Sequence, residues 1–213
     1  MLMSHNEPPV TFTTPMLKAI ANPLRRQILD TLSAMETARA ADLALTLGIP
    51  ANKVSFHLRE LAKAEMIVEV PELARDKRDR VWKPAARGYT TGEVGERPED
   101  QTGTAMDAYL GQVIHDEQRR LQAALRHAEQ HYRGQQPVPV KAQMQTSNLM
   151  LTQDEMQELI HRMEEVVPAF REDLKSGKIA SAQPAESRQV WHVMSLFTEE
   201  SLLNESYGED QTP

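Results

Sequence analysis

A single helix with two chemically opposite faces constrains this chain more than any other feature. It lies in the stretch PANKVSFHLRELAKAEMIVEV, residues 50–70, which predicts a helix over about residues 51–64 running directly into a strand. On a helical wheel at about 100° per residue, one sector is polar apart from one aromatic ring, and it holds Asn52, Ser55, Phe56, Arg59 and Lys63. The opposite sector holds Val54, Leu58 and Leu61, with His57 nearer to that side. One face therefore suits a core and the other a polar partner.

The side chains on the polar face are of types that contact DNA. Asn and Arg make paired hydrogen bonds to base edges, Phe contacts a thymine methyl group or a sugar, and Ser suits a base or a phosphate. An amphipathic surface helix is common, however, so its neighbours decide the interpretation. Residues 41–47 predict another short helix that ends at Gly48, and two strand-like runs, MIVEVPE and DRVWKPA, follow the first helix. This is the element order of a winged helix-turn-helix.

The loop between the two strand-like runs is rich in cations. A wing that lies along the phosphate backbone needs such charges, because each neutralised phosphate releases counterions. Asp76 and Asp79 reduce the net charge of the loop, so its position after the helix matters more than its charge. The predicted DNA-binding residues from the helix and the wing are Asn52, Lys53, Ser55, Phe56, His57, Arg59, Lys63, Arg75, Lys77, Arg78 and Arg80.

Three segments, LKAIANPLRRQILDTL, AADLALTLGIPANKVSFHLRELAKAEMIVE and RVWKPAARG, resemble the winged-helix domain of the ArsR family of bacterial transcriptional repressors. The resemblance covers residues 15–88, about a third of the chain. It implies a homodimer that binds a palindromic operator in double-stranded DNA and releases it when an effector binds. It also implies that Ser55, Phe56 and Arg59 face bases or backbone, that His57 lies at the core edge, and that residues 75–80 form the wing tip.

The chain departs from the metal-sensing members of that family. It contains no cysteine, so the thiolate site of the best-known members is missing. Other members use Asp and His on the terminal helix, where this chain has His115, His127 and His131 but Val113 in place of an acidic residue. His127 and His131 share a helix face, although a solvated or dimer-facing pair is the simpler interpretation. We predict no metal site and no cofactor.

The remaining sequence predicts a mainly α fold with small β elements. We expect a disordered tail at 1–14, the winged-helix domain at 15–90, a linker at 91–104, a dimerisation helix at 105–134, a C-terminal α/β region at 138–200 and a polar tail at 201–213. In the C-terminal region, VKAQMQTSNLML and RQVWHVMSLF read as strands on either side of a helix that is capped by Thr152. The predicted dimerisation stripe holds Met106, Leu110, Val113, Ile114, Leu121 and Leu125.

Charge divides the chain into two parts. The formal net charge is −7, but residues 1–90 carry 13 Lys and Arg against 10 Asp and Glu, whereas residues 91–213 carry 11 against 21. A basic module is therefore joined to an acidic one. The chain has no apolar run long enough to span a membrane and no signal peptide, so we expect a cytoplasmic protein without a membrane partner.

Two other classes of function remain open. An enzyme is disfavoured, because the sequence has no Gly-rich phosphate loop, no cysteine nucleophile, no G-x-S-x-G and no H-E-x-x-H. A winged-helix protein-interaction module, or a ligand-binding protein that does not bind DNA, is the second alternative. A Met-rich apolar set in the C-terminal region could line a pocket for a small-molecule effector, but plain core is the commoner role of such residues.

Overall fold

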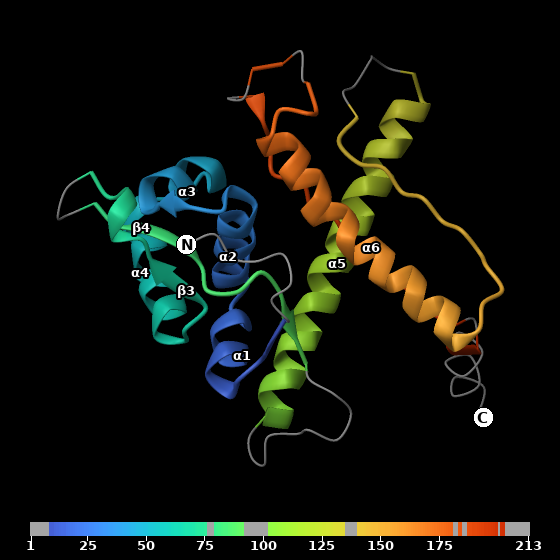
Figure 1. Cartoon of the computed structure of the whole chain (residues 1–213), viewed down its shortest axis with the longest axis horizontal. Helices are drawn as coiled ribbons and strands as arrows, with labels where there is room; N and C mark the ends of the chain where they lie inside the picture. The colour runs from blue at the N-terminus through green and yellow to red at the C-terminus, as the bar shows by residue number, and fades with distance from the viewer. Residues whose placement is uncertain are drawn as a thin grey trace. The chain divides into compact units, whose positions relative to one another are not determined.

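The computed structural model describes residues 9–75, 79–91, 102–134, 140–180, 183–184, 187–199 and 201–202. The chain divides into two units, residues 1–147 and 148–213. In the first unit, helices α1 (Thr14–Ile20), α2 (Pro23–Met35), α3 (Ala40–Leu47) and α4 (Ala51–Lys63) precede a small sheet, and the long helix α5 (Thr102–Tyr132) follows it (Figure 1). The second unit contains helix α6 (Gln153–Lys175). The predicted class, mainly α with small β elements, is confirmed.

Local signals fix where the first helices begin and end. Pro23 opens α2, and the Asn22 side chain accepts the Arg25 N–H at 3.1 Å as an N-cap. Gly48 ends α3 with a φ of +66°, a left-handed conformation that glycine adopts without a steric penalty. Glu65 takes a φ of +58° just after α4 and turns the chain into strand β3 (Ile67–Glu69).

The wing is the outer part of a three-stranded antiparallel sheet. Strand β4 (Val81–Pro84) lies in the middle, between β3 and the short strand β2 (Ala38–Arg39) that precedes α3. Ile67 pairs with Pro84 and Ala38 pairs with Trp82. The sequence analysis predicted β3 and β4 but not β2. Because β2 comes directly before α3 and pairs with β4, the sheet connects the wing to the start of the helix-turn-helix.

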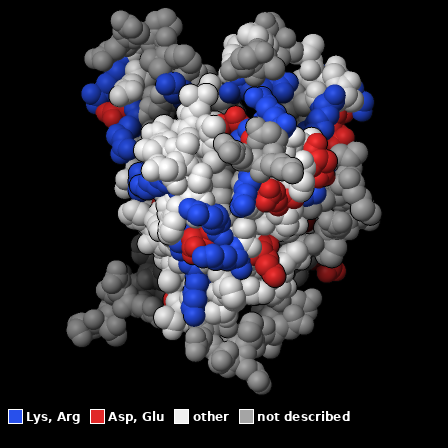
Figure 2. Space-filling view, turned by 90° about the vertical axis from the view of Figure 1, so that its left-hand side faces the viewer, with Lys and Arg blue, Asp and Glu red and all other residues white. Residues whose placement is uncertain are grey.

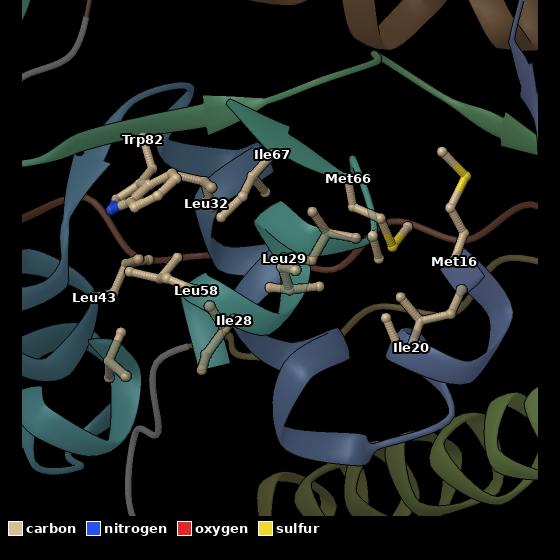
Figure 3. Close-up of a cluster of buried hydrophobic side chains, with 14 of the residues drawn as sticks. Met16, Ile20, Ile28, Leu29, Leu32, Leu43, Leu58, Met66, Ile67 and Trp82 are labelled. Atoms are coloured by element: carbon tan, nitrogen blue, oxygen red, sulfur yellow. The ribbon is translucent and has the colours of Figure 1, made fainter. Parts of the chain in front are cut away.

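The core of the first unit lies between the helices and this sheet. Its fully buried side chains come from every helix from α1 to α4 and from the segment that enters β3; they include Leu17, Ile28, Leu32, Leu43, Leu58, Leu61, Met66 and Ile67. Figure 3 shows side chains from α2, α4, β3 and β4 meeting in one cluster with Trp82. Helix α4 contributes the apolar face that the wheel predicted, and its burial fixes the rotation of that helix.

The predicted disordered tail at 1–14 is wrong for its described part, residues 9–14. Strand β1 (Val10–Thr11) pairs in parallel with β5 (Tyr89–Thr90), and α1 begins at Thr14. Phe12 is buried, stacking on Tyr89 with ring centroids 5.1 Å apart and meeting Tyr109 of α5 at 5.2 Å. This buried aromatic contact orders the segment.

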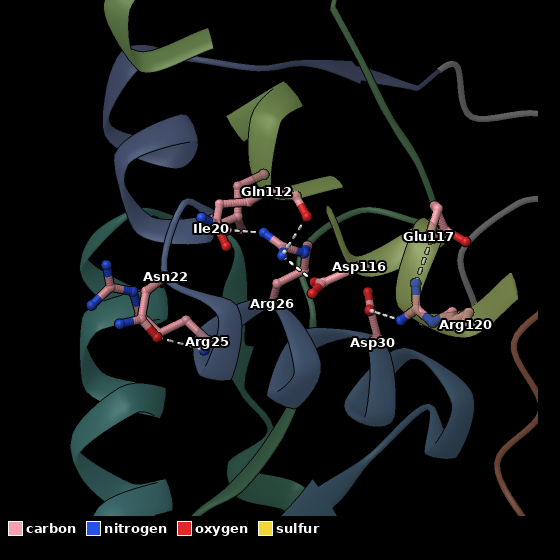
Figure 4. A network of polar contacts seen from close by, with 9 residues as sticks. All are labelled: Ile20, Asn22, Arg25, Arg26, Asp30, Gln112, Asp116, Glu117 and Arg120. Atoms are coloured by element: carbon pink, nitrogen blue, oxygen red, sulfur yellow. Dashed lines mark hydrogen bonds and ion pairs between the residues drawn. The ribbon is translucent and has the colours of Figure 1, made fainter. Parts of the chain in front are cut away.

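Helix α5 is attached to α1 and α2 by polar contacts as well as packing (Figure 4). Arg26 donates to the carbonyl oxygen of Ile20 at 2.7 Å and to that of Gln112 at 3.4 Å, and it forms an ion pair with Asp116. Burial raises the pKa of the Asp116 carboxyl, but the hydrogen bond and charge of Arg26 outweigh it, so the pKa is lowered. A second pair joins Arg120 to Asp30 at 3.8 Å.

The two strands predicted in the C-terminal region are not formed. Residues 140–152 and 188–197 are described and carry neither strand nor helix. Alternating apolar residues specify only which face a strand would bury, whereas a strand also needs a neighbouring backbone for its hydrogen bonds. The predicted helix is present, and the capping box between Thr152 and Glu155 marks its start. None of the helices that the structure describes combines the length and apolar character needed to cross a bilayer.

Replacing Leu58 by Ala tests whether α4 is held by its buried face. Leu58 is 1% exposed, so the change should lower the free energy of unfolding by about 2–5 kcal/mol through lost burial and an unfilled cavity. Leu45 on α3 is 87% exposed and provides a matched Leu→Ala control, expected within about 0.5 kcal/mol of the parent. Urea titration followed by circular dichroism measures both variants, and equal losses would contradict the packing described here.

Candidate nucleic-acid interface

The polar face of α4 is presented to solvent. Asn52, Lys53, Arg59 and Lys63 are exposed, Phe56 is 51% exposed and Ser55 is half-buried. Phe56 is the large apolar side chain of α4 that stays outside the core, whereas Val54, Leu58 and Leu61 are buried. The face therefore combines amide, hydroxyl, guanidinium and aromatic groups on one rigid helix.

Hydrogen bonds within α4 orient several of these side chains. The Ser55 hydroxyl donates to the carbonyl oxygen of Ala51 at 2.8 Å, and Arg59 donates through Nε to the carbonyl oxygen of Ser55 at 3.3 Å. Among the described residues, Nη1 and Nη2 of Arg59 make no hydrogen bond in this arrangement, so its paired donors are available. Lys63 is different, because its ammonium group lies 2.7 Å from Oε1 of Glu60 and part of its charge is compensated.

His57 does not lie on this face, so its inclusion among the DNA-binding residues is corrected. Its ring is 8% exposed, lies edge-on to Phe56 at 5.3 Å, and its Nδ1 has no hydrogen-bond partner among the described residues. Burial lowers the pKa of His57, and the positive charges of Arg25 and Lys53 lower it further. Because the folded protein favours the neutral ring, this group costs stability when the pH falls below the ordinary imidazole pKa.

The wing carries exposed cations at both ends of its loop. Arg75 is exposed, and Arg80 is exposed with its Nε 3.9 Å from Oε2 of Glu69. Lys77 and Arg78 lie outside the described residues. These four positions stay predictions as contacts to phosphate.

An internal ion pair holds the base of the wing. Arg39, at the end of β2, donates through Nε to both carboxylate oxygens of Asp79, at 2.7 and 3.0 Å, and through Nη2 to the carbonyl oxygen of Leu73 at 3.3 Å. The same carboxylate accepts the Arg75 N–H at 3.0 Å. Asp79 therefore joins both ends of the wing loop to β2. The sequence analysis had assigned it only a reduction of the loop's net positive charge.

The charge state of Asp79 follows from these contacts. The hydrogen bond from Arg39 and that from the Arg75 amide lower the pKa of the Asp79 carboxyl, and Asp79 raises the pKa of Arg39 in return. A lowered carboxyl pKa means that the pair's contribution is complete at neutral pH and is lost as the pH falls through the folded-state pKa of Asp79.

Arg25 is a cation near α4 that sequence reasoning did not select. It donates through Nη2 to the carbonyl oxygen of Lys18 at 3.1 Å and through Nε to that of Ala19, at the C-terminal end of α1. Burial lowers the pKa of His57 and the Lys63 hydrogen bond lowers that of Glu60, and the charge of Arg25 lowers both further. In the sequence, Arg25 is visible only as one of two consecutive arginines after Pro23. Its nearness to α4 could not be predicted, because α4 begins 26 residues later.

Cations gather on the side of the molecule that carries these elements. Figure 2 views the first unit from the side where α3, α4 and β4 lie in Figure 1, and it shows Lys and Arg in several clusters with Asp and Glu interspersed. On this face the cations therefore form several clusters rather than one continuous patch. Such a surface suits an extended polyanion.

The predicted dimerisation stripe on α5 is split by the structure. Met106 packs against the core of its own unit and Val113 is half-buried. The other members, Leu110, Ile114, Leu121 and Leu125, are exposed and fall within about 60° of one another on the helix. The side of α5 that bears Ala105, Tyr109 and Asp116 faces α1 and α2, so the exposed stripe points away from the first unit's core.

No metal centre is assembled in the part of the chain that the structure describes. Its His, Asp and Glu residues form no group of three that could hold an ion. His127 instead accepts the backbone N–H of Lys141 through Nε2 at 3.3 Å. The absence of a metal cofactor stays a prediction.

A comparison with protein-family models matches residues 20–70 to a helix-turn-helix domain. This range runs from the end of α1 through α4 to the end of β3, so it contains α3, α4 and the first strand of the wing. A search of curated proteins finds no match. The family match and the wing support a winged-helix, DNA-binding transcriptional regulator, and they do not single out the ArsR family.

Two solved structures illustrate more distant likeness. A double mutant of ZitR from Lactococcus lactis in apo form is 16% identical, with a TM-score of 0.31, over 70% of this chain and 83% of that one. A mutant of MarR from E. coli is 15% identical, with a TM-score of 0.30, over 72% of this chain and 85% of that one. These likenesses are too remote to bear on function.

Removing the Asp79 carboxylate tests its role at the wing base. In Asp79→Ala the Arg75 amide loses its acceptor, so hydrogen exchange at Arg75 should become severalfold faster at neutral pH. Glu72→Ala removes an exposed carboxylate from the neighbouring 3₁₀ turn (Pro71–Leu73) and is the matched control, expected to leave that exchange unchanged. Exchange at Arg75 that is the same in both variants would show that Asp79 does not hold the wing.

Proposed function

We propose that this protein is a cytoplasmic, dimeric transcriptional regulator of the ArsR type that binds a palindromic operator in double-stranded DNA. The observation that carries the proposal is the exposed face of α4, with the available Nη1 and Nη2 donors of Arg59 and the half-exposed Phe56, next to a cationic wing. The proposed DNA-binding residues are Asn52, Lys53, Ser55, Phe56, Arg59 and Lys63 on α4 and Arg75, Lys77, Arg78 and Arg80 on the wing. No enzymatic activity is part of this proposal.

The two elements divide the work. A helix side chain that reaches a base edge in the major groove reads sequence, whereas a wing cation that meets a phosphate fixes position and contributes counterion release. Arg59 belongs to the first group because its paired donors match the O6 and N7 acceptors of guanine. Arg75 belongs to the second group because it extends from the loop that the Asp79 carboxylate holds.

Repression and release require a second site. We propose that a small-molecule effector or an assembly change acts on the region beyond α4, with α5 holding two subunits through its exposed stripe. Two reading helices related by a two-fold axis would then face half-sites about one helical turn apart. A winged-helix protein-interaction module remains the second candidate function, favoured by the apolar surface outside the first unit's core.

Arg59→Ala and Arg75→Ala separate sequence reading from backbone contact. If Arg59 reads a base, its loss should weaken operator binding by about 1–3 kcal/mol and relax preference at one base pair. Loss of Arg75 should weaken all duplexes alike and reduce the salt slope by about one. Selection from a random duplex pool followed by salt titrations gives both quantities. Arg162→Ala on α6 provides the control, expected to change neither.

The α5 stripe is tested by Ile114→Glu. A charge placed in the middle of a buried helix seam should raise the monomer–dimer dissociation constant at least about tenfold, which corresponds to 1.4 kcal/mol. Gln122→Glu adds the same charge to an exposed position of α5 outside the stripe and serves as the control. Sedimentation equilibrium over a range of concentrations measures both, and an unchanged dissociation constant in Ile114→Glu would remove α5 as the dimer seam.

A further inference from the structure

Helix α6 is an amphipathic helix whose apolar face is only partly covered by the described residues. It runs for 23 residues from a capping box, and none of its residues is buried. Its apolar side chains recur at alternating four- and three-residue steps: Met156, Ile160, Met163, Val167, Phe170 and Leu174. Leu159 and Val166 widen this stripe on one side, and Phe170 is still 53% exposed. A stripe with this heptad spacing is built for another helix.

The described residues of the second unit form no buried hydrophobic cluster. Every residue in the hydrophobic core cluster lies between Phe12 and Ala105, in the first unit. In the second unit, α6 and residues 188–199, which carry no regular secondary structure, both expose large apolar side chains, among them Trp191, Val193 and Leu196. Such a unit does not bury enough apolar surface to offset the entropy of ordering it. A partner is therefore required.

Charges along α6 identify the partner. Several of them are compensated within the helix, for example Arg162 by Glu158 at 2.8 Å and Lys175 by Glu172 at 3.7 Å. Glu164 and Arg171 are exposed and have no ion-pair or hydrogen-bond partner among the described residues. They lie seven residues apart on the same flank of the apolar stripe, so this flank carries one uncompensated charge of each sign.

We infer that α6 pairs with α6 of a second copy of this chain in an antiparallel arrangement. When the two-fold axis passes close to residue 168, Glu164 of each copy lies beside Arg171 of the other, which gives two ion pairs. Val167 then lies opposite Phe170, and Met163 opposite Leu174, so the stripe closes on itself. The ring of Pro168 lies on the outer side of the helix and does not obstruct this contact.

A parallel arrangement of the two helices leaves the charges of Glu164 and Arg171 without partners. In a parallel, in-register pair the flanking positions meet five residues apart, which places Glu164 beside Leu159 and Arg171 beside Val166. Both charges would then border apolar side chains without compensation. Antiparallel helices also place their macrodipoles head to tail. This interface is separate from the α5 stripe and from the DNA-binding face, so it goes beyond the proposed function and does not depend on it.

Single-cysteine variants of the full chain test the arrangement, because the natural chain contains no cysteine. Val167→Cys places the thiols of two copies near the two-fold axis, so mild oxidation should give a disulfide-linked dimer. Ile160→Cys lies one heptad earlier on the same stripe, where antiparallel copies hold the thiols about 20 Å apart, beyond disulfide reach. Glu165→Cys, on the outer face, is the matched background control. Non-reducing gel electrophoresis without DNA reports each rate.

Each outcome decides the proposal. Rapid cross-linking of Val167→Cys alone supports it. Cross-linking of both Val167→Cys and Ile160→Cys would show parallel pairing and overturn it, and rates in both equal to that of Glu165→Cys would show that no second copy covers this face. The charge pairing has its own test in the Val167→Cys background: Glu164→Arg should slow the cross-link roughly fivefold, and adding Arg171→Glu should restore it. DNA binding by the reduced variants is measured separately, so failure of this interface is distinguishable from failure of DNA recognition.

Discussion

The rotation of α4 about its own axis is the constraint on which the candidate interface depends. Val54, Leu58 and Leu61 are fully buried at one side of the helix, so no other rotation keeps the core closed. Because positions three and four residues apart share a face, this burial alone presents Asn52 and Arg59 to solvent. The direction of the polar face is therefore set by the buried face, without contacts made by the polar side chains themselves. Substitutions on the polar face should therefore change recognition with little effect on folding, whereas changes beneath it affect both.

A second constraint fixes the direction of α5. Arg26 bonds the last carbonyl of α1, the carbonyl oxygen of Gln112 and the carboxylate of Asp116, and the two ionic side chains are largely buried. Removing one partner of such a pair leaves an uncompensated charge out of water, which is why buried pairs tolerate few substitutions. Arg26 lies in the first turn of α2, close to the Asn22 N-cap. Its contacts therefore attach α5 to the N-terminal end of α2, which packs against the helix-turn-helix. In a dimer held by α5, this attachment would set the separation of the two reading helices.

Sequence reasoning succeeded where a signal is local and failed where two distant segments must meet. Asn22-Pro23, Gly48 and Thr152 each satisfy backbone groups within one turn, and the helix ends that they predict are present. The pairing of β1 with β5, and the contact of Arg39 with Asp79, join residues about 80 and 40 positions apart, so no window of sequence contains them. His57 was misassigned because it lies between the polar and apolar sectors of the helical wheel. At such a position the tertiary packing, and not the wheel, determines whether the side chain is buried. The C-terminal strands failed because alternation does not supply a hydrogen-bonding neighbour.

If two copies pair through the uncovered apolar surface, the proposed assembly would be coupled to the proposed DNA recognition. The first unit closes its core by Ala105, and the exposed stripes lie beyond it, on α5 and α6. A single reading face offers few side chains to a half-site, so one subunit alone would hold DNA weakly. Joining two subunits makes the second half-site contact intramolecular and multiplies the affinity without any new protein–DNA contact. An effector that altered helix pairing beyond Ala105 would therefore release the operator while every residue of α4 stayed in place. In such a design the DNA-binding residues need not sense anything, which is consistent with a reading face and a wing that contain no cysteine and, in their described part, no metal-binding cluster.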